Sequence, residues 1–323
     1  MRMHRDGATG LALIAVGCLA LGCPQAARAQ VKLEYKFPEG QKLSYKTTMK
    51  IHQILTINGQ EVPTDVDQTV VASQTVGQRR GDSTLPVTSK VESLRAELSL
   101  PGGINVTFDT KDPNAKVEIE QLAFLSEVFK LAGEVVYTIV LDPQNKVKAI
   151  EGTEKLLEKA DKLSPPARDA IRSQVETEKL KRQFEQSHRN LPDVLARTGE
   201  PWERDETMDI GNGQTLSFHK KYEYTGTETK GGKTLDKITT KALEVKYSMD
   251  PDAPTPLKVT KSDLKLEASE GTILFDREAG CVVEAGGKTR IKGSMTFSIN
   301  GQELPGDLDL TLESKEELQP AAK

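Results

Sequence analysis

Two pairs of aspartates at strand spacing are the residues of this sequence that most resemble a chemical site. Asp65 and Asp67 lie near one end of the chain, and Asp307 and Asp309 lie near the other. Side chains at positions i and i+2 of a strand point to the same face, so each pair could hold a metal ion or act as an acid and a base. The preferred interpretation is an exposed strand face on which lysines of the neighbouring strand neutralise these aspartates.

Three further motifs match binding sites only in part. Gly232-Lys233-Thr234 and Gly287-Lys288-Thr289 lack the upstream glycine of a phosphate-binding loop, and Gly211-x-Gly213 lacks the third glycine of a dinucleotide site. The sequence contains no H-E-x-x-H, C-x-x-C or G-x-S-x-G motif. It therefore assigns no catalytic residue, no cofactor-binding residue and no metal ligand, and it predicts no cofactor.

The histidines and the single tryptophan are interpreted as structural residues and not as parts of a site. His52, His188 and His219 are far apart in the sequence, and His188 is predicted to lie on the surface of a charged helix. Trp202 is predicted to fill the core where the helical segment rejoins the sheet, with a ligand anchor as the alternative. Because active sites assemble from distant residues, an enzyme remains an alternative, but it is not the preferred interpretation.

A repeated phrase gives the strongest structural signal. Residues 57–69 and residues 299–311 are identical at nine of thirteen positions, and both begin with Ile-Asn-Gly-Gln-Glu. Asn-Gly between alternating apolar residues is typical of a two-residue β-hairpin turn. Pro63 and Pro305 follow the turns, and they are predicted to lie at an edge or a bulge because proline cannot donate to a strand ladder.

Counting outward from the two turns predicts the pairing of both hairpins. Apolar pairs then share one face, and opposite charges share the other, whereas a slip of one residue would reverse every side chain. His52 faces Asp65, but Ser294 takes its place in the second copy, which argues against a shared His–Asp site. The predicted pairs are Lys50 with Asp67, Ile51 with Val66, Leu55 with Val62, Lys292 with Asp309, Ile291 with Leu310, and Phe297 with Leu304.

The first 29 residues are typical of a secretory signal peptide. Arg2 and Arg5 precede a short apolar run, and Ala27-Arg28-Ala29 is a small-x-small cleavage site. Lipoprotein processing at Cys23 is the less favoured alternative. The protein is therefore expected to be exported to the periplasm or outside the cell, with no segment that spans a membrane.

Composition narrows the classes of partner. Residues 1–29 hold three basic residues and one acidic residue, so cleavage changes the net charge from −4 to −6. This charge is unsuited to a phosphate backbone, and no nucleic acid partner is predicted. Cys281 alone remains after cleavage, so no intrachain disulfide is expected, and Cys281 is predicted to be a small residue on a strand face.

The chain is expected to form two related β-meanders separated by helices. Residues 40–45 and 213–218 are similar, which suggests a larger duplication, and a turn is predicted at Glu270-Gly271 before the strand 272–276. The expected parts are a signal peptide (1–29), a first β-meander (30–112), a helical segment with a short hairpin (113–200), a second β-meander (201–318) and a disordered tail (319–323), with 30–318 forming one structural domain.

The segment between the meanders carries helical patterns. Residues 117–132 are apolar around most of a helical wheel, which predicts a buried helix. Residues 153–163 also look helical, and Ser164-Pro165 is a helix start with proline at the first helical position. The helix that follows runs to about Asn190, and its apolar residues change sides near Thr177, which predicts a kink or partners on two sides.

Four segments resemble an uncharacterised family of exported bacterial proteins that carry a domain of unknown function. These segments are Phe37-Pro38-Glu39-Gly40-Gln41-x-Leu43-x-Tyr45, Leu191-Pro192, Gly199-Glu200-Pro201-Trp202-Glu203 and Thr272-Ile273-Leu274-Phe275-Asp276. The resemblance covers nearly the whole chain after residue 29. It implies an exported, β-rich protein and supplies no catalytic residues. An architectural similarity to the periplasmic lipoprotein carriers is expected, which does not establish function.

The sequence therefore predicts an α+β protein. A strongly curved antiparallel sheet forms a barrel-like shell around the 117–132 helix, and the 153–190 helices cover an opening or an edge. The favoured function is non-enzymatic binding of an apolar small molecule or a lipidated partner in the concave face. The alternatives are a structural or interaction protein of the cell envelope with a filled core, and a hydrolase with an unrecognised site. The oligomeric state is left open.

Overall fold

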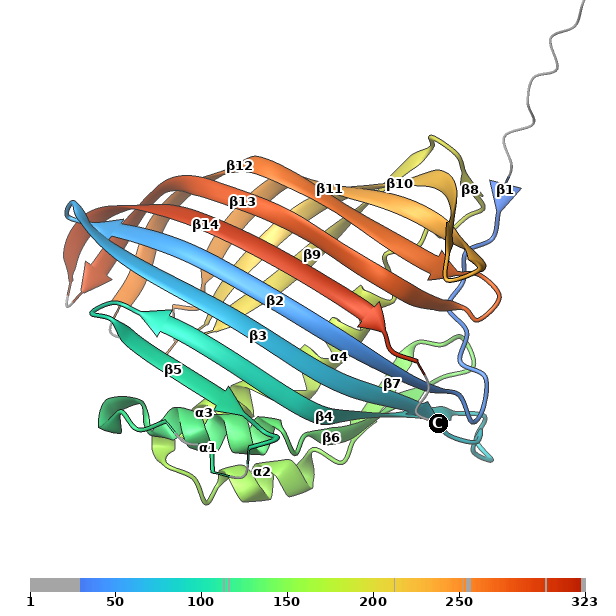
Figure 1. The fold of residues 1–323 in the computed structure, drawn as a ribbon, viewed down its shortest axis with the longest axis horizontal. Helices are drawn as coiled ribbons and strands as arrows, with labels where there is room; N and C mark the ends of the chain where they lie inside the picture. The colour runs from blue at the N-terminus through green and yellow to red at the C-terminus, as the bar shows by residue number, and fades with distance from the viewer. Residues whose placement is uncertain are drawn as a thin grey trace, which may run out of the picture.

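The computed structural model describes residues 30–320, apart from residues 113, 116, 212, 252, 254–256 and 300. Most of these residues form long antiparallel strands (Figure 1). The strands are β1 (Gln30–Val31), β2 (Lys42–Ile57), β3 (Gln60–Val76), β4 (Leu85–Leu100), β5 (Ile104–Asp109), β6 (Val136–Leu141), β7 (Val147–Glu151), β8 (Ala196–Arg197), β9 (Pro201–Gly211), β10 (Gln214–Lys230), β11 (Lys233–Met249), β12 (Leu257–Asp276), β13 (Cys281–Ile299) and β14 (Gln302–Leu318).

The main sheet has twelve strands and is curved but not closed. Its order is β7-β6-β4-β3-β2-β14-β13-β12-β11-β10-β9, with β5 paired to β4, and the short strands β1 and β8 form a separate pair. Figure 1 shows β12, β13, β14, β2 and β3 across the front, with β9 behind them. The expectation of a curved, β-rich α+β fold is confirmed, and the shell is an open one.

The predicted register of both hairpins is confirmed. Each of the six expected pairs is present, including Lys50 opposite Asp67 and Lys292 opposite Asp309. Asn58 and Gly59 have φ values of 50° and 79°, as a type I′ turn requires. Residue 300, the asparagine of the second turn, lies outside the described residues.

Both hairpins meet in the middle of the sheet, where β14 pairs with β2 from Gly306 opposite Ile57 to Leu318 opposite Tyr45. Pro63 pairs with β2 only, because the β3–β4 ladder begins at Asp65. Pro305 pairs with β13 only, because the β14–β2 ladder begins at Gly306. Each proline therefore lies where its strand has a neighbour on one side, as predicted.

Alternation along the strands separates an apolar inner face from a charged outer face. One inner cluster joins strands on opposite sides of the shell: Leu216, Phe218, Ala242 and Val245 of β10 and β11 pack with Ile291, Met295, Phe297, Leu308, Leu310 and Leu312 of β13 and β14. A second cluster includes Val31 and Leu33 of the N-terminal segment, Leu191, and Tyr222, Ile238 and Phe275 of the sheet. The concave face is therefore packed in these two regions.

The helices lie on the concave side and near the β4–β5 edge. They are a 3-10 turn (Glu120–Leu122), α1 (Phe124–Ala132), α2 (Glu154–Ala160), α3 (Pro165–Gln174) and α4 (Thr177–Ser187). Helix α3 starts at Pro165 after Ser164, as predicted. The chain breaks between α3 and α4 at Val175 and Glu176, which confirms the kink expected near Thr177.

The structure corrects the expectation for residues 117–132. The helix α1 has only nine residues, and Leu131 is its only buried side chain. It packs against α2, α3 and β4, where Phe129 contacts the cluster of Leu94, Ala96 and Phe108. The helix thus covers one edge of the inner face, while α4 contributes residues to the cavity described below. The apolar wheel reflects contacts with both the sheet and the neighbouring helices.

The predicted turn at Glu270-Gly271 is wrong. Strand β12 continues through both residues, and Gly271 pairs with Thr240 on one side and Gly287 on the other. This glycine allows close approach between strands and does not make a turn. Short connections instead follow Leu100, Leu141 and Lys230.

The predicted signal peptide and the end of the predicted tail, residues 321–323, lie outside the described residues. Within residues 30–320 as described, no helix has the length and apolar character needed to cross a membrane. Gln319 N–H donates to Ser44 O at 2.7 Å, so the chain just after β14 still contacts the sheet.

The assignment of inner and outer faces can be tested with two neighbouring residues of β13. Ile291 is fully buried in the inner cluster, and Lys292 points outward to Asp309. Ile291→Ala should lower the free energy of unfolding by about 2–5 kcal/mol because it leaves a cavity. Lys292→Ala should lower it by less than about 1 kcal/mol because exposed ion pairs contribute little. Urea denaturation measures both, and similar losses in the two variants would contradict this assignment of faces.

Candidate functional site

The aspartate pairs lie on the outer face, and three of the four aspartates form ion pairs. Asp67 is 3.2 Å from Lys50, Asp309 is 3.0 Å from Lys292, and Asp65 is 2.6 Å from His52. Arg290 also contacts Asp309 at 2.8 Å, and these cations hold the Asp309 pKa low, at about 2. No group of three or more metal-ligating side chains occurs among the described residues. The interpretation as a solvated, charge-paired face is confirmed.

The glycine-lysine-threonine motifs also lie in a sheet context. Gly232 and Lys233 form the end of the β10–β11 hairpin, and Lys233 pairs with Asp276 at 2.8 Å. Gly287-Lys288-Thr289 lies within β13, and Lys288 pairs with Glu313 at 2.5 Å. Neither motif opens a helix, so a phosphate-binding loop is excluded at both places.

A cavity of about 450 Å³ lies in the concave face, between the inner side of the sheet and the end of α4. Its apolar lining comes from β2, β9, β10, β11, β12 and β14: Met49, Met208, Phe218, Ala242, Ile273 and Leu312. These residues belong to or border the two inner clusters, which leave the space between them empty. The sequence predicts that the 117–132 helix lies inside the shell, but the helix that adjoins the cavity is α4.

An ion pair marks one side of the cavity. Lys220 Nζ lies 2.6 Å from a carboxylate oxygen of Glu206, and Tyr222 donates its hydroxyl hydrogen to the same carboxylate. Alternation places Phe218, Lys220 and Tyr222 on one face of β10, so the pair adjoins the apolar lining. Because Glu206 is already neutralised by these two partners, it serves better as a fixed polar contact than as a free base.

The helix α4 forms the polar cover of the cavity. Gln186 donates from Nε2 to Thr207 Oγ1 at 2.8 Å and accepts from Thr207 N at 3.3 Å. Lys179 is buried and pairs with Asp209 at 2.8 Å. These contacts fix α4 to the edge strand β9, so Gln183, Gln186 and Asn190 present amide groups to the cavity.

The opposite side of the cavity carries a buried carboxyl group. Burial raises the pKa of Glu316, and a hydrogen bond with Thr47 opposes this shift. Burial likewise raises the pKa of Tyr35 and Tyr45, and Glu316 adds to both shifts. Tyr45 donates to Val282 O at 3.2 Å, and Tyr35 donates to Asn190 Oδ1 at 2.8 Å. The groups on this side of the cavity, Glu316 and the two tyrosines behind it, therefore favour their neutral forms.

His188 differs from its prediction as a surface residue. It ends α4 and stacks on Phe184 with a ring separation of 4.0 Å, and Tyr35 and Phe37 pack close to it. Its Nδ1–H donates to Phe184 O at 2.9 Å. Burial lowers the pKa of His188 to about 4, although this hydrogen bond opposes the shift. The imidazole is therefore neutral at ordinary pH and helps close one end of the shell.

Trp202 lies where it was predicted, at the junction of the helical segment and the sheet. It stacks on Tyr222 with ring centroids 5.8 Å apart and donates from Nε1 to Asn190 O. Cys281 is buried at the start of β13, and burial raises the pKa of its thiol. Both residues are structural.

Sequence reasoning did not identify the residues of the cavity because they come from eight separate elements. The charged residues Glu206, Lys220 and Glu316 occupy inner-face positions of strands whose neighbours are apolar, for example Lys220 between Phe218 and Tyr222. A charge at an inward position is the one local signal that could have identified them.

The sequence matches a known family model. A family of unknown function, DUF6263, matches residues 82–282. The chain belongs to this family. The expectation of a family of unknown function is therefore confirmed, and the family itself names no activity. No curated protein matches the sequence.

Several solved structures are similar over most of the chain. A lipovitellin structure, titled for its lipid–protein interactions, is 12% identical with a TM-score of 0.42, and the match covers 89% of this chain but 26% of the lipovitellin chain. The chain thus spans about a quarter of that protein. A putative exported protein with a YmcC-like fold from Bacteroides fragilis is 9% identical, with 90% and 99% coverage and a TM-score of 0.25. A putative outer membrane lipoprotein-sorting protein domain from Vibrio parahaemolyticus is 9% identical, with 87% coverage of each chain and a TM-score of 0.12. No functional argument rests on similarities this distant.

The lowered pKa of His188 predicts a specific loss of stability in acid. Its pKa is lower in the folded chain than the ordinary value of 6.5, so its contribution is complete above pH 6.5 and is lost as the pH falls toward 4. The loss at pH 4 should be up to about 3 kcal/mol. His188→Phe keeps an aromatic ring but cannot be protonated, so its stability should fall less over this range.

Urea denaturation of both proteins from pH 7 to pH 4 measures the difference. Comparison with the variant is needed because Glu316 has a raised pKa, so its protonation increases stability as the pH falls over part of the same range. Asp82 and Asp309 have lowered pKa values of about 2, so their protonation lowers stability mainly below pH 4. If the free energies of unfolding of the two proteins changed in parallel with pH, protonation of His188 would not destabilise the fold, and the prediction would be wrong.

Proposed function

We propose that this protein is an exported, non-enzymatic binding protein that holds an apolar or amphipathic small molecule in the cavity of its concave face. The observation that carries the proposal is the cavity of about 450 Å³ that the chain's own side chains leave empty between two packed clusters. Pockets for small molecules are typically about 300–1,000 Å³, mainly apolar and supplied with a few fixed polar groups.

The lining supports a ligand with an apolar part and a polar part. Met49, Phe218 and Leu312 offer apolar surface, whose burial against a ligand contributes about 25 cal/mol per Å². The paired Glu206 and Lys220 offer oriented polar contacts without a free buried charge. Polar groups lie on both sides of the cavity, with Glu206 of β9 on one side and Glu316 of β14 on the other, so a ligand with a polar part and an apolar part finds contacts for each.

Export is part of this proposal. Residues 1–29 have the pattern of a secretory signal peptide, and the basic n-region precedes a short apolar run and a small-x-small site. A protein delivered outside the cytoplasm could move apolar molecules through the aqueous envelope.

A hydrolase is the second candidate, and Glu316 is the observation that favours it. Its raised pKa would suit a general acid, and it lines the same cavity as Glu206. Binding is preferred because Glu206 is already paired with Lys220 and Tyr222. Glu316→Gln should leave ligand affinity nearly unchanged if the protein only binds. Time-dependent breakdown of a bound ester by the unmodified protein, and not by this variant, would favour the hydrolase.

Two residues of β14 provide a matched test of binding. Ser314 lines the cavity, whereas Asp307 lies on the outer face of the same strand and is not part of the lining. Ser314→Trp should fill the cavity and weaken binding of a fluorescent single-chain fatty acid by at least roughly tenfold. Asp307→Trp adds bulk on the outer face and should change the affinity by less than about twofold.

Thermal unfolding of both variants checks that each remains folded, and organic extraction of the unmodified protein followed by mass spectrometry seeks a co-purified lipid. Equal affinities in the two variants, or no binding and no extracted lipid, would contradict the proposal. A filled core with cross-linked envelope partners would then favour the structural alternative.

A further inference from the structure

Backbone pairing between β11 and β12 stops part-way along the wall of the shell. These strands pair only from Asp236 opposite Phe275 to Thr240 opposite Gly271. Beyond that point residues 241–249 and 257–270 form no ladder with each other, and we call the space between them the β11–β12 seam. At the start of the seam a side chain replaces a backbone acceptor, because Ala242 N–H donates to Ser269 Oγ at 2.9 Å.

Three glycines lie beside the seam, and the wall of the shell is thin there because glycine has no side chain. Gly271 of β12 pairs with Gly287 of β13, and Gly286 pairs with Thr272. A Cβ atom at Gly287 would lie 2.7 Å from Glu270 O, so the strands approach too closely for a side chain there. A glycine within a strand lowers stability by about 0.5–1 kcal/mol relative to alanine. The three glycines therefore reduce the stability of the sheet here, but they allow the strands to approach closely and they leave open space.

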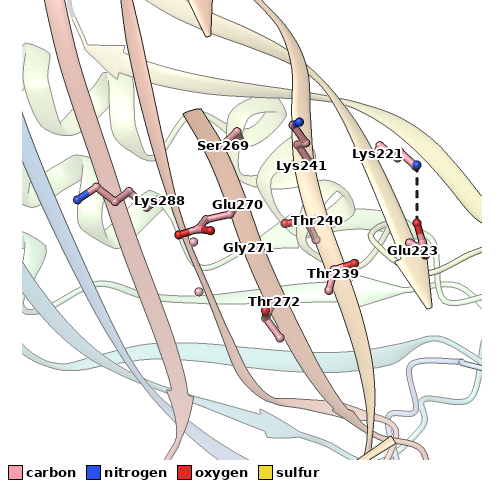
Figure 2. A pocket seen from close by; sticks show the side chains of 12 residues that line it. Lys221, Glu223, Thr239, Thr240, Lys241, Ser269, Glu270, Gly271, Thr272 and Lys288 are labelled. Atoms are coloured by element: carbon pink, nitrogen blue, oxygen red, sulfur yellow. Dashed lines mark ion pairs between the residues drawn. The ribbon is translucent and has the colours of Figure 1, made fainter. Parts of the chain in front are cut away.

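The outer side of the seam is a groove of about 590 Å³ (Figure 2). Alternation places Lys221, Thr239 and Lys241 on the outer face, because the inward residues of the same strands are Tyr222, Ile238 and Ala242. The groove and the inner cavity share six lining residues: Thr240, Ser269, Glu270, Thr272, Gly286 and Gly287. The two spaces therefore adjoin through the seam, with only this thin wall between them.

Two charged residues at the outer mouth of the groove have no partner within the described part of the chain. Lys221 pairs with Glu223 at 3.7 Å, the ion pair drawn in Figure 2, and Lys288 pairs with Glu313 at 2.5 Å. Among the described residues, Lys241 and Glu270 make no ion pair or side-chain hydrogen bond. The mouth of the groove therefore presents the cation of Lys241 and the anion of Glu270 to a ligand, a few residues from an apolar cavity.

We propose that the ligand is a single-chain amphiphile with a zwitterionic head, which lies through the β11–β12 seam. Its chain occupies the inner cavity, and its head lies in the outer groove, with the phosphate near Lys241 and the amine near Glu270. This inference rests on the proposed binding function and adds the class of ligand and its orientation. The head remains in water, which avoids the cost of burying its charges.

The position of the head can be measured directly. A fluorophore is attached to Thr239→Cys in the outer groove, and to Lys246→Cys as a control on the same strand outside the groove. Cys281 is buried and should not react in the folded protein. A lysophospholipid with a nitroxide on its head should quench the label at position 239 at least roughly fivefold more than the label at position 246. The same lipid with the nitroxide at its chain end should show no such difference.

The outcomes separate this inference from the proposed function. Saturable binding without selective quenching at position 239 would overturn the seam orientation and leave the binding function intact. Absence of binding for any single-chain lipid would overturn both. As a second measurement, Lys241→Met and Glu270→Gln should each weaken a lysophosphatidylethanolamine by roughly threefold to tenfold, whereas Lys246→Met should have no effect. Equal affinity for zwitterionic, anionic and uncharged heads would overturn the assignment of the head.

Discussion

The alternation of side chains along an antiparallel strand is the constraint on which the other features of this structure depend. Once the Asn58-Gly59 turn sets the pairing of β2 with β3, every residue of the neighbouring strands is assigned to the inner or the outer face. Bulges change this assignment locally. Glu92 in β4 and Leu243 in β11 are extra residues, and each restores an apolar inner face on the far side of the bulge. Leu243 remains exposed as a consequence.

This alternation also explains how a charged sequence forms a cavity. The outer face absorbs most of the charge in exposed pairs such as Lys292 with Asp309, each of which contributes little to stability. The few charges on the inner face are accommodated differently. Glu206 is paired, Glu316 favours its neutral form, and His188 stays neutral. Apolar surface survives on the inner face because these charged groups are paired or neutral.

The sequence predicts the local features of this fold well and its long-range features poorly. Hairpin pairing follows from two turn residues and a period of two, so Ile291 opposite Leu310 could be predicted without knowledge of the rest of the chain. Glu270-Gly271 misled the prediction because glycine serves close packing as well as turns, and only the positions of Thr240 and Gly287 distinguish these uses. His188 was misjudged because the apolar groups around it, Tyr35 and Phe37, lie about 150 residues earlier. The cavity depends on the same long-range arrangement.

The position of β14 has a consequence for the order in which the molecule folds. Residues 302–318 pair with β13 on one side and with β2 on the other, so the centre of the sheet joins residues that are 249 to 273 positions apart in the sequence. Contacts at such separation form slowly because closing a long loop costs entropy. Until they form, β2 and β13 each present an unpaired edge that can recruit strands from other molecules. A chain interrupted before residue 302 would keep both edges exposed, which makes aggregation, rather than partial activity, its expected fate.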